Sequence, residues 1–354
     1  MSTMKAYKLV EWGQPGQYVT VPKPTPGPFD VLLRVRAVGL CRSDLDMMDS
    51  PPGTDPYASV LEPDYILGHE TAGVVEELGS SITDLKVGEG VAVHHMRHCG
   101  FCEFCEAGIE QHCEYYKRGD IGMTRGCGFD GGLAEFLVVP RTEVVSIGDG
   151  DPIIYAPLTD AGVTAYAGMK GFVSQLRPGN SVAVIGVGGL GAYAVQFLKL
   201  LTSARIIAVD NADSRLKMAT ELGADAEVLS DSNAAKSIRS VTGGKGVDAV
   251  LDLVGSDQTL QLAANVIRPQ GYISVVGMQG GSVKLGWNLM ATSSKFALSL
   301  GSTRKDLREV CQLATDGKLR IDIDRFDFDQ IPKAYEKLRK GELKGRAVIV
   351  MPQS

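Results

Sequence analysis

Residues 181–201 read SVAVIGVGGLGAYAVQFLKLL, a short β-branched run followed by a glycine-rich turn and an apolar helical stretch. Gly186, Gly188 and Gly191 have the spacing G-x-G-x-x-G directly after the run SVAVI. Glycines at this spacing let backbone amides approach a pyrophosphate at the positive end of the following helix. The alternative is a tight strand-to-helix turn that binds nothing.

The next strand-like run, RIIAVD, ends in Asp210 at the distance expected for an acid that binds the adenosine ribose. A carboxylate at this place accepts hydrogen bonds from the ribose hydroxyls and repels the extra phosphate of NADP. The sequence therefore predicts NAD as the cofactor. The alternative role for Asp210 is to cap the next helix.

The rest of the chain shows two different patterns of predicted secondary structure. From Ser181, runs such as VDAVLDLVG and GYISVVG alternate with helical stretches such as DQTLQLAANVI, which predicts a parallel sheet covered on both faces. Before about residue 155 the chain reads as short strands divided by glycine and proline, among them DVLLRVRAVG and GVAVHH. A helix within TRKDLREVCQLATDGKL and a last strand, RAVIVM, are expected to return to this first part.

Bulk properties limit the function classes. A chain of 354 residues suits two domains, and a formal net charge of -6 without a basic stripe argues against nucleic acid as a partner. The start MSTMKAYKLV lacks a signal-peptide core, and no later window is apolar for long enough to span a bilayer. We therefore expect a cytoplasmic protein with no membrane contact.

Four of the seven cysteines lie in one short hydrophilic segment, where Cys99, Cys102, Cys105 and Cys113 have the spacing C-x2-C-x2-C-x7-C. This spacing lets four thiolates close a tetrahedral zinc site with no open position, which is typical of a structural metal. Free thiols on a loop are the alternative.

A second metal site is predicted from three separate stretches: Cys41 in GLCRSD, His69 in GHE and Asp160 in PLTDAGVTAY. A catalytic zinc needs three protein ligands and one exchangeable position, and a thiolate, an imidazole and a carboxylate would suffice. Taken singly, Cys41 could be a core thiol, His69 a structural histidine and Asp160 a helix N-cap.

These motifs together resemble the zinc-dependent medium-chain dehydrogenase/reductase family, which includes the alcohol dehydrogenases. GLCRSD, LGHE, the cysteine quartet, KVGEGVAV and VIGVGGLG stand in that family's order over nearly the whole chain. The stretch APLTDAGVTAY looks like the bacterial NAD-dependent secondary alcohol dehydrogenases, in which an aspartate replaces a cysteine as the third zinc ligand. This resemblance favours Asp160 as a ligand.

The resemblance implies an α/β protein with a GroES-like β-rich catalytic domain, residues 1–157 and 298–354, around a doubly wound Rossmann domain, residues 158–297. It also implies that Glu70 can become an exchangeable zinc ligand and that Asp44 orients His69. Some relatives carry a proton-relaying histidine where this chain has Asp46, so the outer end of the relay is open.

The expected activity is hydride transfer between secondary alcohols or ketones and NAD(H), with one catalytic and one structural zinc. Ser43 is expected to carry the hydroxyl proton away through the cofactor ribose. The candidates for an apolar wall of the substrate pocket are Met47, Met48, Tyr57 and Trp287. For each of them, packing in the protein core is the alternative. The residues expected to contact NAD are Arg42, Gly186, Gly188, Gly189, Leu190, Gly191, Asp210, Arg215, Val254, Gly255 and Val276.

Three other functions stay open at this point. A polyol or amino-alcohol dehydrogenase would need several polar groups in the pocket. A non-catalytic nucleotide-binding protein would use both metals for the fold alone. A zinc-free enoyl reductase would lack both metal-ligand groups. Relatives also suggest a homo-oligomer, either a tetramer or a dimer.

Overall fold

The computed structural model describes residues 2–51, 61–118, 121–122 and 124–352. The chain forms two compact units, Met1–Val163 with Gly301–Ser354, and Thr164–Leu300. Both boundaries lie a few residues later than the sequence suggests. At the first of them, the turn η4 (Ala156–Thr159) packs on strands of the first unit. Asp160 consequently belongs to the first unit.

The second unit is built on one parallel sheet. Its strand order is β15-β14-β13-β16-β17-β18, and every neighbouring pair is parallel. In chain order this is 3-2-1-4-5-6, the order of a dinucleotide-binding Rossmann sheet. The strands are β13 (Ser181–Ile185), β14 (Arg205–Asp210), β15 (Ala226–Leu229), β16 (Val247–Asp252), β17 (Ile267–Val275) and β18 (Lys295–Leu298).

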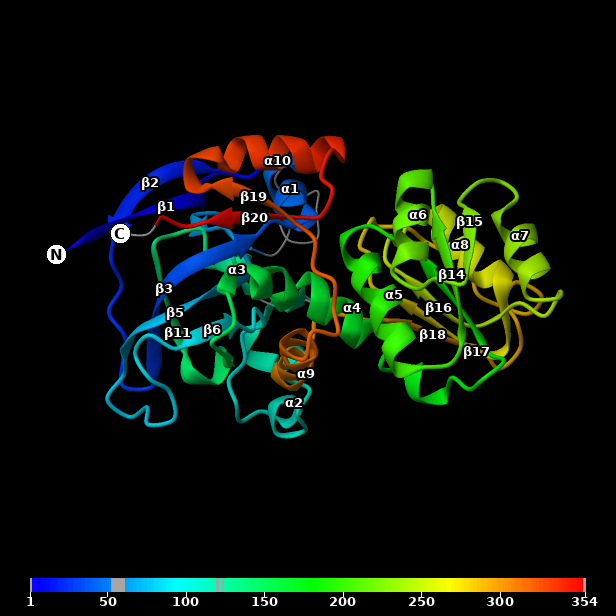
Figure 1. Cartoon of the computed structure of the whole chain (residues 1–354), viewed down its shortest axis with the longest axis horizontal. Coiled ribbons are helices and arrows are strands. Elements are labelled where there is room, and N and C mark those ends of the chain that lie inside the picture. Colours follow the sequence, from blue (N-terminus) through cyan, green and yellow to red (C-terminus); the bar gives the residue numbers. More distant parts are fainter. Residues whose placement is uncertain (1, 52–60, 119–120, 123, 353–354) are drawn as a thin grey trace. The chain divides into compact units, whose positions relative to one another are not determined.

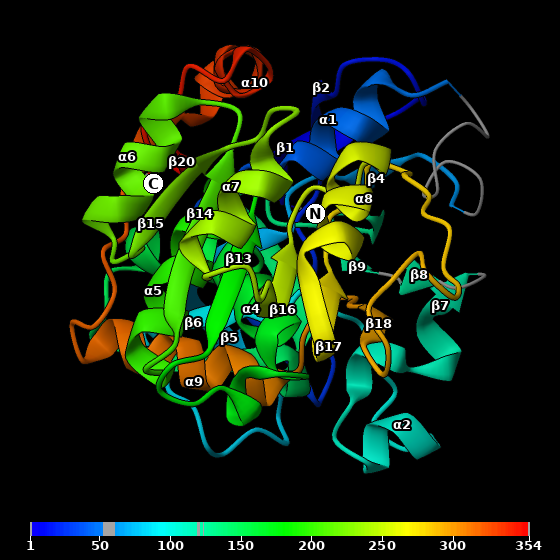
Figure 2. The ribbon, with the colours of Figure 1, turned by 90° about the vertical axis from the view of Figure 1, so that its right-hand side faces the viewer.

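Helices cover both faces of this sheet (Figure 2). Helix α5 packs against α6, and α7 packs against α8, while each helix also contacts strands of the sheet. All five residues of β13 are buried, because a strand in the middle of a doubly covered sheet has no solvent face. The helices are α5 (Gly189–Leu201), α6 (Asp213–Glu221), α7 (Ala234–Val241) and α8 (Asp257–Val266). The predicted Rossmann fold is confirmed.

The first unit is mostly β-structure, as expected (Figure 1). A seven-stranded sheet has the order β12-β6-β5-β3-β20-β19, with β11 also paired to β3. Its strands are β3 (Asp30–Gly39), β5 (Glu70–Leu78), β6 (Gly90–Val93), β11 (Phe136–Pro140), β12 (Val144–Gly148), β19 (Ile323–Asp327) and β20 (Arg346–Val350). A second sheet, β2-β1-β4, consists of β1 (Thr3–Leu9), β2 (Gln17–Pro22) and β4 (Tyr65–Ile66).

The end of the chain completes this unit. Strand β20 pairs antiparallel with β3, so the prediction that the tail returns to the first part is confirmed. Helix α9 (Arg304–Thr315) starts at a capping box in which Thr303 and Asp306 satisfy each other's backbone amides. Helix α10 (Ile331–Lys340) ends at Gly341, whose left-handed φ of 68° suits a C-cap.

Shorter elements fill the connections. They are α1 (Arg42–Asp49), α2 (Glu103–Glu106), α3 (Pro152–Tyr155), α4 (Ala161–Met169), β7 (Lys117–Arg118), β8 (Ile121–Gly122), β9 (Thr124–Arg125), β10 (Gly128–Phe129), and the 3-10 turns η1 (Glu110–His112), η2 (Glu114–Tyr116), η3 (Arg141–Glu143), η5 (Val173–Gln175) and η6 (Phe328–Gln330). Within the described ranges, no helix combines the length and the apolar character that crossing a membrane requires.

Candidate functional site

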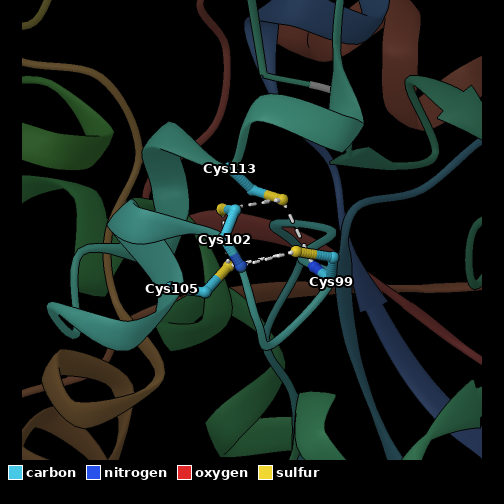
Figure 3. Close-up of side chains that lie close together, drawn as sticks. All are labelled: Cys99, Cys102, Cys105 and Cys113. Carbon is cyan, nitrogen blue, oxygen red and sulfur yellow. Dashed lines mark hydrogen bonds between the residues drawn. The ribbon is translucent and has the colours of Figure 1, made fainter.

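The cysteine quartet converges around one point (Figure 3). Its sulfur atoms all lie within 4.8 Å of one another, with Sγ–Sγ distances of 3.8 Å for Cys99 and Cys105, 3.5 Å for Cys102 and Cys105, and 4.0 Å for Cys102 and Cys113. Tetrahedral zinc with Zn–S bonds of about 2.3 Å separates its sulfurs by about 3.8 Å. The four residues therefore fit the predicted closed zinc site.

A second group of ligands lies in the same unit. Atoms of Cys41, His69, Glu70 and Asp160 all lie within 4.8 Å of one another. Cys41 is the N-cap of α1, His69 precedes β5 and Glu70 begins it, and Asp160 follows the turn η4. Three separate segments of the chain thus supply a thiolate, an imidazole and carboxylates, a donor set that zinc accepts.

The ring of His69 is oriented by its neighbours. Its Nδ1 lies 3.3 Å from Oδ1 of Asp44, and the other oxygen of Asp44 accepts a hydrogen bond from the backbone amide of Cys41. Its Nε2 lies 3.5 Å from Oδ2 of Asp160 and 3.3 Å from Oγ of Ser43. A histidine held at Nδ1 by a carboxylate presents Nε2 to a metal, which is the usual arrangement around zinc ligands.

Burial and charge shift the pKa values of this group. Burial alone lowers the pKa of His69, but the carboxylates of Asp44 and Asp160 outweigh it and raise the pKa well above its ordinary value. Burial alone raises the pKa of Asp160, yet the hydrogen bond and charge of His69 keep it below its usual range. The site thus favours a positive charge between its acidic side chains, which is what a divalent cation supplies.

Glu70 is ion-paired with Arg346 at the start of β20, and both are buried. Burial raises the pKa of Glu70 to about 8, although the charge of Arg346 acts in the opposite direction. Sequence reasoning missed Arg346. An arginine at the head of the apolar run AVIVM was the available signal, because a buried arginine requires a carboxylate partner.

His95 is a second residue that sequence reasoning missed. It is the second residue after β6, is 5% exposed, and its Nδ1 lies 2.8 Å from the carbonyl oxygen of Thr159. Its Nε2 lies 3.8 Å from Oδ1 of Asp160, and its ring centroid lies 6.3 Å from that of His69. The pair His94-His95 shortly before the cysteine quartet was the signal that could have found it.

The glycine loop of the second unit has the geometry of a phosphate-binding turn. Gly186 has φ +86°, and a Cβ on Gly191 would lie 2.3 Å from the carbonyl oxygen of Gly186. A Cβ on Gly188, the N-cap of α5, would meet nothing within 4 Å, and the next residue, Gly189, is exposed. A helix N-terminus that follows such a glycine turn can bind a pyrophosphate.

Asp210 holds this loop as well as ending β14. Its Oδ2 accepts a hydrogen bond from the amide of Val187 at 2.9 Å, its Oδ1 accepts one from Ala212 at 3.1 Å, and Arg215 lies 3.6 Å away. The N-cap position of α6 belongs to Ala212, so Asp210 is not the cap of that helix.

The carboxyl end of β16 adjoins the same loop. Asp252, which sequence reasoning missed, accepts hydrogen bonds from the amides of Val254 at 2.9 Å and Gly255 at 3.1 Å. Val276 follows β17 at the same edge of the sheet. The ends of β13 and β16 meet where the strand order reverses, which is where dinucleotides bind in such sheets.

The remaining candidates fall in different places. Arg42 is exposed in the first turn of α1. Met47 and Met48 are buried in the core of the first unit, where Sδ of Met47 lies 3.0 Å from the hydroxyl of Tyr65. Trp287 is 87% exposed. Tyr57 lies outside the described residues.

Comparison with known proteins agrees with both units. Residues 27–149 match the model of the alcohol dehydrogenase GroES-like domain, and residues 189–316 match that of the zinc-binding dehydrogenases. An alcohol dehydrogenase of Geobacillus stearothermophilus is 33% identical over 98% of this chain and 99% of its own length. An NAD-dependent alcohol dehydrogenase of Sulfolobus acidocaldarius is 32% identical with the same coverage.

Solved structures give the same result. The alcohol dehydrogenase of the archaeon Aeropyrum pernix superposes with a TM-score of 0.89 at 34% identity, covering 98% of this chain and 99% of that one. The predicted family, the zinc and NAD cofactors and the enzyme class are confirmed, and neither a non-catalytic protein nor a zinc-free reductase is favoured. The chain belongs to the zinc-dependent alcohol dehydrogenase family, and it is an oxidoreductase of alcohols and ketones that uses zinc and NAD.

Proposed function

We propose that this enzyme oxidises secondary alcohols and reduces the corresponding ketones, with Cys41, His69 and Asp160 as the protein ligands of its catalytic zinc. The observation that carries the proposal is the convergence of these side chains, with Glu70, within 4.8 Å. When bound, zinc supplies a Lewis acid that acidifies an alcohol or polarises a ketone, and NAD supplies the hydride acceptor.

The residues around the ligands have separate tasks. Asp44 fixes the ring of His69 from the Nδ1 side, at 3.3 Å. The hydroxyl of Ser43 lies 3.3 Å from His69 Nε2, and a neutral hydroxyl can take a proton from the substrate hydroxyl and donate its own onward. Arg42 is assigned to the cofactor pyrophosphate, because a guanidinium binds phosphate oxygens in a bidentate manner.

Glu70 is proposed as the exchangeable ligand. Its carboxylate is paired with Arg346 and also belongs to the group of ligand atoms, so it could pair either with Arg346 or with a bound zinc ion. With zinc bound, Glu70 would be the residue that can hold the ion in exchange with substrate or product.

The direct test compares two cysteine variants. Cys41→Ala should lose one of two zinc equivalents and nearly all oxidation of 2-butanol and cyclohexanol, whereas Cys311→Ala, a buried thiol outside both ligand groups, should keep both. Sorbitol and threonine serve as competing substrates. Activity that survives in Cys41→Ala would refute the proposal, and so would oxidation of sorbitol or threonine that is faster than oxidation of every simple secondary alcohol and diol tested.

We further propose that the enzyme is cytoplasmic, because reducing conditions there keep the thiolate ligands reduced.

We also propose that the chain forms a homo-oligomer through the edge strand β18. Within the described sheet β18 pairs with β17 alone, and apolar side chains on and before it are exposed: Leu285 50%, Trp287 87%, Leu289 50% and Leu298 79%. An open apolar edge is a template for pairing with a second chain. Trp287→Arg should reduce the mass measured by light scattering, and an unchanged mass would argue against this edge.

A further inference from the structure

We propose that His95 is a substrate-binding residue and that the preferred substrates carry a second hydroxyl beside the reacting carbon, as vicinal diols and α-hydroxyketones do. The inference rests on the proposed function and narrows its substrate class.

The first step is the tautomer of His95. Its Nδ1 lies 2.8 Å from the carbonyl oxygen of Thr159, and a carbonyl oxygen only accepts hydrogen bonds. Nδ1 therefore carries a proton. In the neutral ring the lone pair is then on Nε2, which makes Nε2 a hydrogen-bond acceptor.

The second step is what surrounds this acceptor. Among the described residues no donor reaches Nε2, and its near neighbour, Oδ1 of Asp160 at 3.8 Å, is itself an acceptor and too distant for a hydrogen bond. The side chain of His95 is 6% exposed. Its Nε2 is not completely enclosed, whereas Nδ1 of His94 is completely enclosed and has no hydrogen-bond partner among the described residues. Nε2 thus keeps some accessible surface, and a donor can approach it there.

The third step identifies the donor. Asp160 turns its Oδ2 towards Nε2 of His69, 3.5 Å away, and its Oδ1 towards His95. A substrate whose reacting oxygen sits at the ligand group therefore has His95 at its side. A hydroxyl on the adjacent carbon can donate to Nε2, and a plain secondary alcohol leaves this acceptor without a partner. Sites built around such an acceptor reject substrates that lack the donor.

The test uses the holoenzyme with 2,3-butanediol and 2-butanol, which differ by one hydroxyl. After correction for the two reactive carbons of the diol, kcat/KM should favour the diol by roughly tenfold or more. The same preference should appear in equilibrium binding to the enzyme–NADH complex, in which no hydride can leave the alcohol, followed by NADH fluorescence.

Two matched variants separate a substrate contact from a structural role. His95→Asn keeps a donor towards Thr159 but lacks the acceptor at Nε2, so the preference should fall to about one. His95→Gln can place an acceptor near the position that Nε2 occupies in the wild type, so it should keep part of the preference for the diol. His98→Asn, whose ring lies 3.3 Å from the carbonyl of Met96, is the control and should leave the ratio unchanged.

Each outcome decides the matter. If the wild-type enzyme oxidises 2-butanol as fast as the diol, the inference is overturned, and water is then the partner of Nε2. The proposed function is unaffected by this result. Equal losses for both alcohols in His95→Asn overturn it in favour of a structural role. Loss of zinc in that variant still leaves the wild-type ratio as the deciding measurement. An enzyme that oxidises no alcohol refutes the proposed function itself.

Discussion

Adding one methyl group at Gly39 tests the buried position of Glu70. Gly39 ends β3 and faces Glu70 at the start of β5. A Cβ at Gly39 would lie 1.9 Å from Oε2 of Glu70 and 2.8 Å from its Cδ. Since carbon and oxygen atoms in contact stand roughly 3.5 Å apart, Gly39→Ala has to move this carboxylate by about 1.5 Å or more.

The displaced carboxylate has little room to move. Glu70 is fully buried and paired with Arg346, so the methyl group overpacks the core at a cost of about 1–3 kcal/mol. For a unit of this size the melting temperature should fall by roughly 2–12 °C. Because Glu70 also belongs to the ligand group, kcat/KM should fall on the order of a hundredfold, as expected for a misplacement of about 1 Å.

The assay combines a thermal melt followed by circular dichroism, elemental analysis for zinc, and kcat/KM for 2-butanol. Gly286→Ala is the matched control, since its Cβ would meet only Cδ1 of Leu289, at the ordinary distance of 3.7 Å. A Gly39→Ala enzyme with the melting temperature and kcat/KM of the wild type would show that Glu70 does not occupy this slot, and the reasoning would be refuted.

Three further predictions concern other parts of the chain. Cys105→Ser should remove the structural zinc alone, leaving one equivalent by elemental analysis and a lower melting temperature; two retained equivalents would contradict the closed site. Asp210→Asn keeps an acceptor for Val187 but removes a charge, so kcat/KM for NADP relative to NAD should rise by roughly tenfold or more, and an unchanged ratio would remove Asp210 from cofactor choice. Burial raises the pKa of Cys311 to about 12, so the folded protein keeps this thiol neutral at pH 8 and should resist iodoacetamide in mass spectrometry until it is denatured. Any stability that comes from this raised pKa is present at neutral pH and is lost only as the pH rises towards 12.

Local sequence patterns were sufficient to predict the strands and the zinc-ligand geometry of the cysteine quartet. The run DVLLRVRAVG predicts β3 to the residue, and the stretch RAVIVM contains β20, because alternating or continuous β-branched residues suit a strand in any context. The quartet spans fifteen positions, so its ligand geometry depends on a short loop, and sequence spacing alone predicts it.

Partners from distant segments could not be predicted in this way. Arg346 meets Glu70 across 276 positions, and His95 reaches Thr159 across 64. No local pattern encodes such a contact, since it depends on which strands pair and in which register. The buried environment of Met47 was equally undetermined, because a methionine in such a stretch suits a core and a pocket wall alike.

By itself, the sequence determined the doubly wound sheet, the glycine loop that begins α5 and the residue types of both metal-ligand groups. These features depend on neighbours along the chain, whose spacing is written in the residue order. Only the tertiary structure decided that Asp160 faces two histidine rings, that Glu70 is held by Arg346 and that His95 offers an acceptor beside the ligands. The physical reason is that these contacts arise when separate strands and turns pack together, and packing fixes distances that sequence separation leaves free.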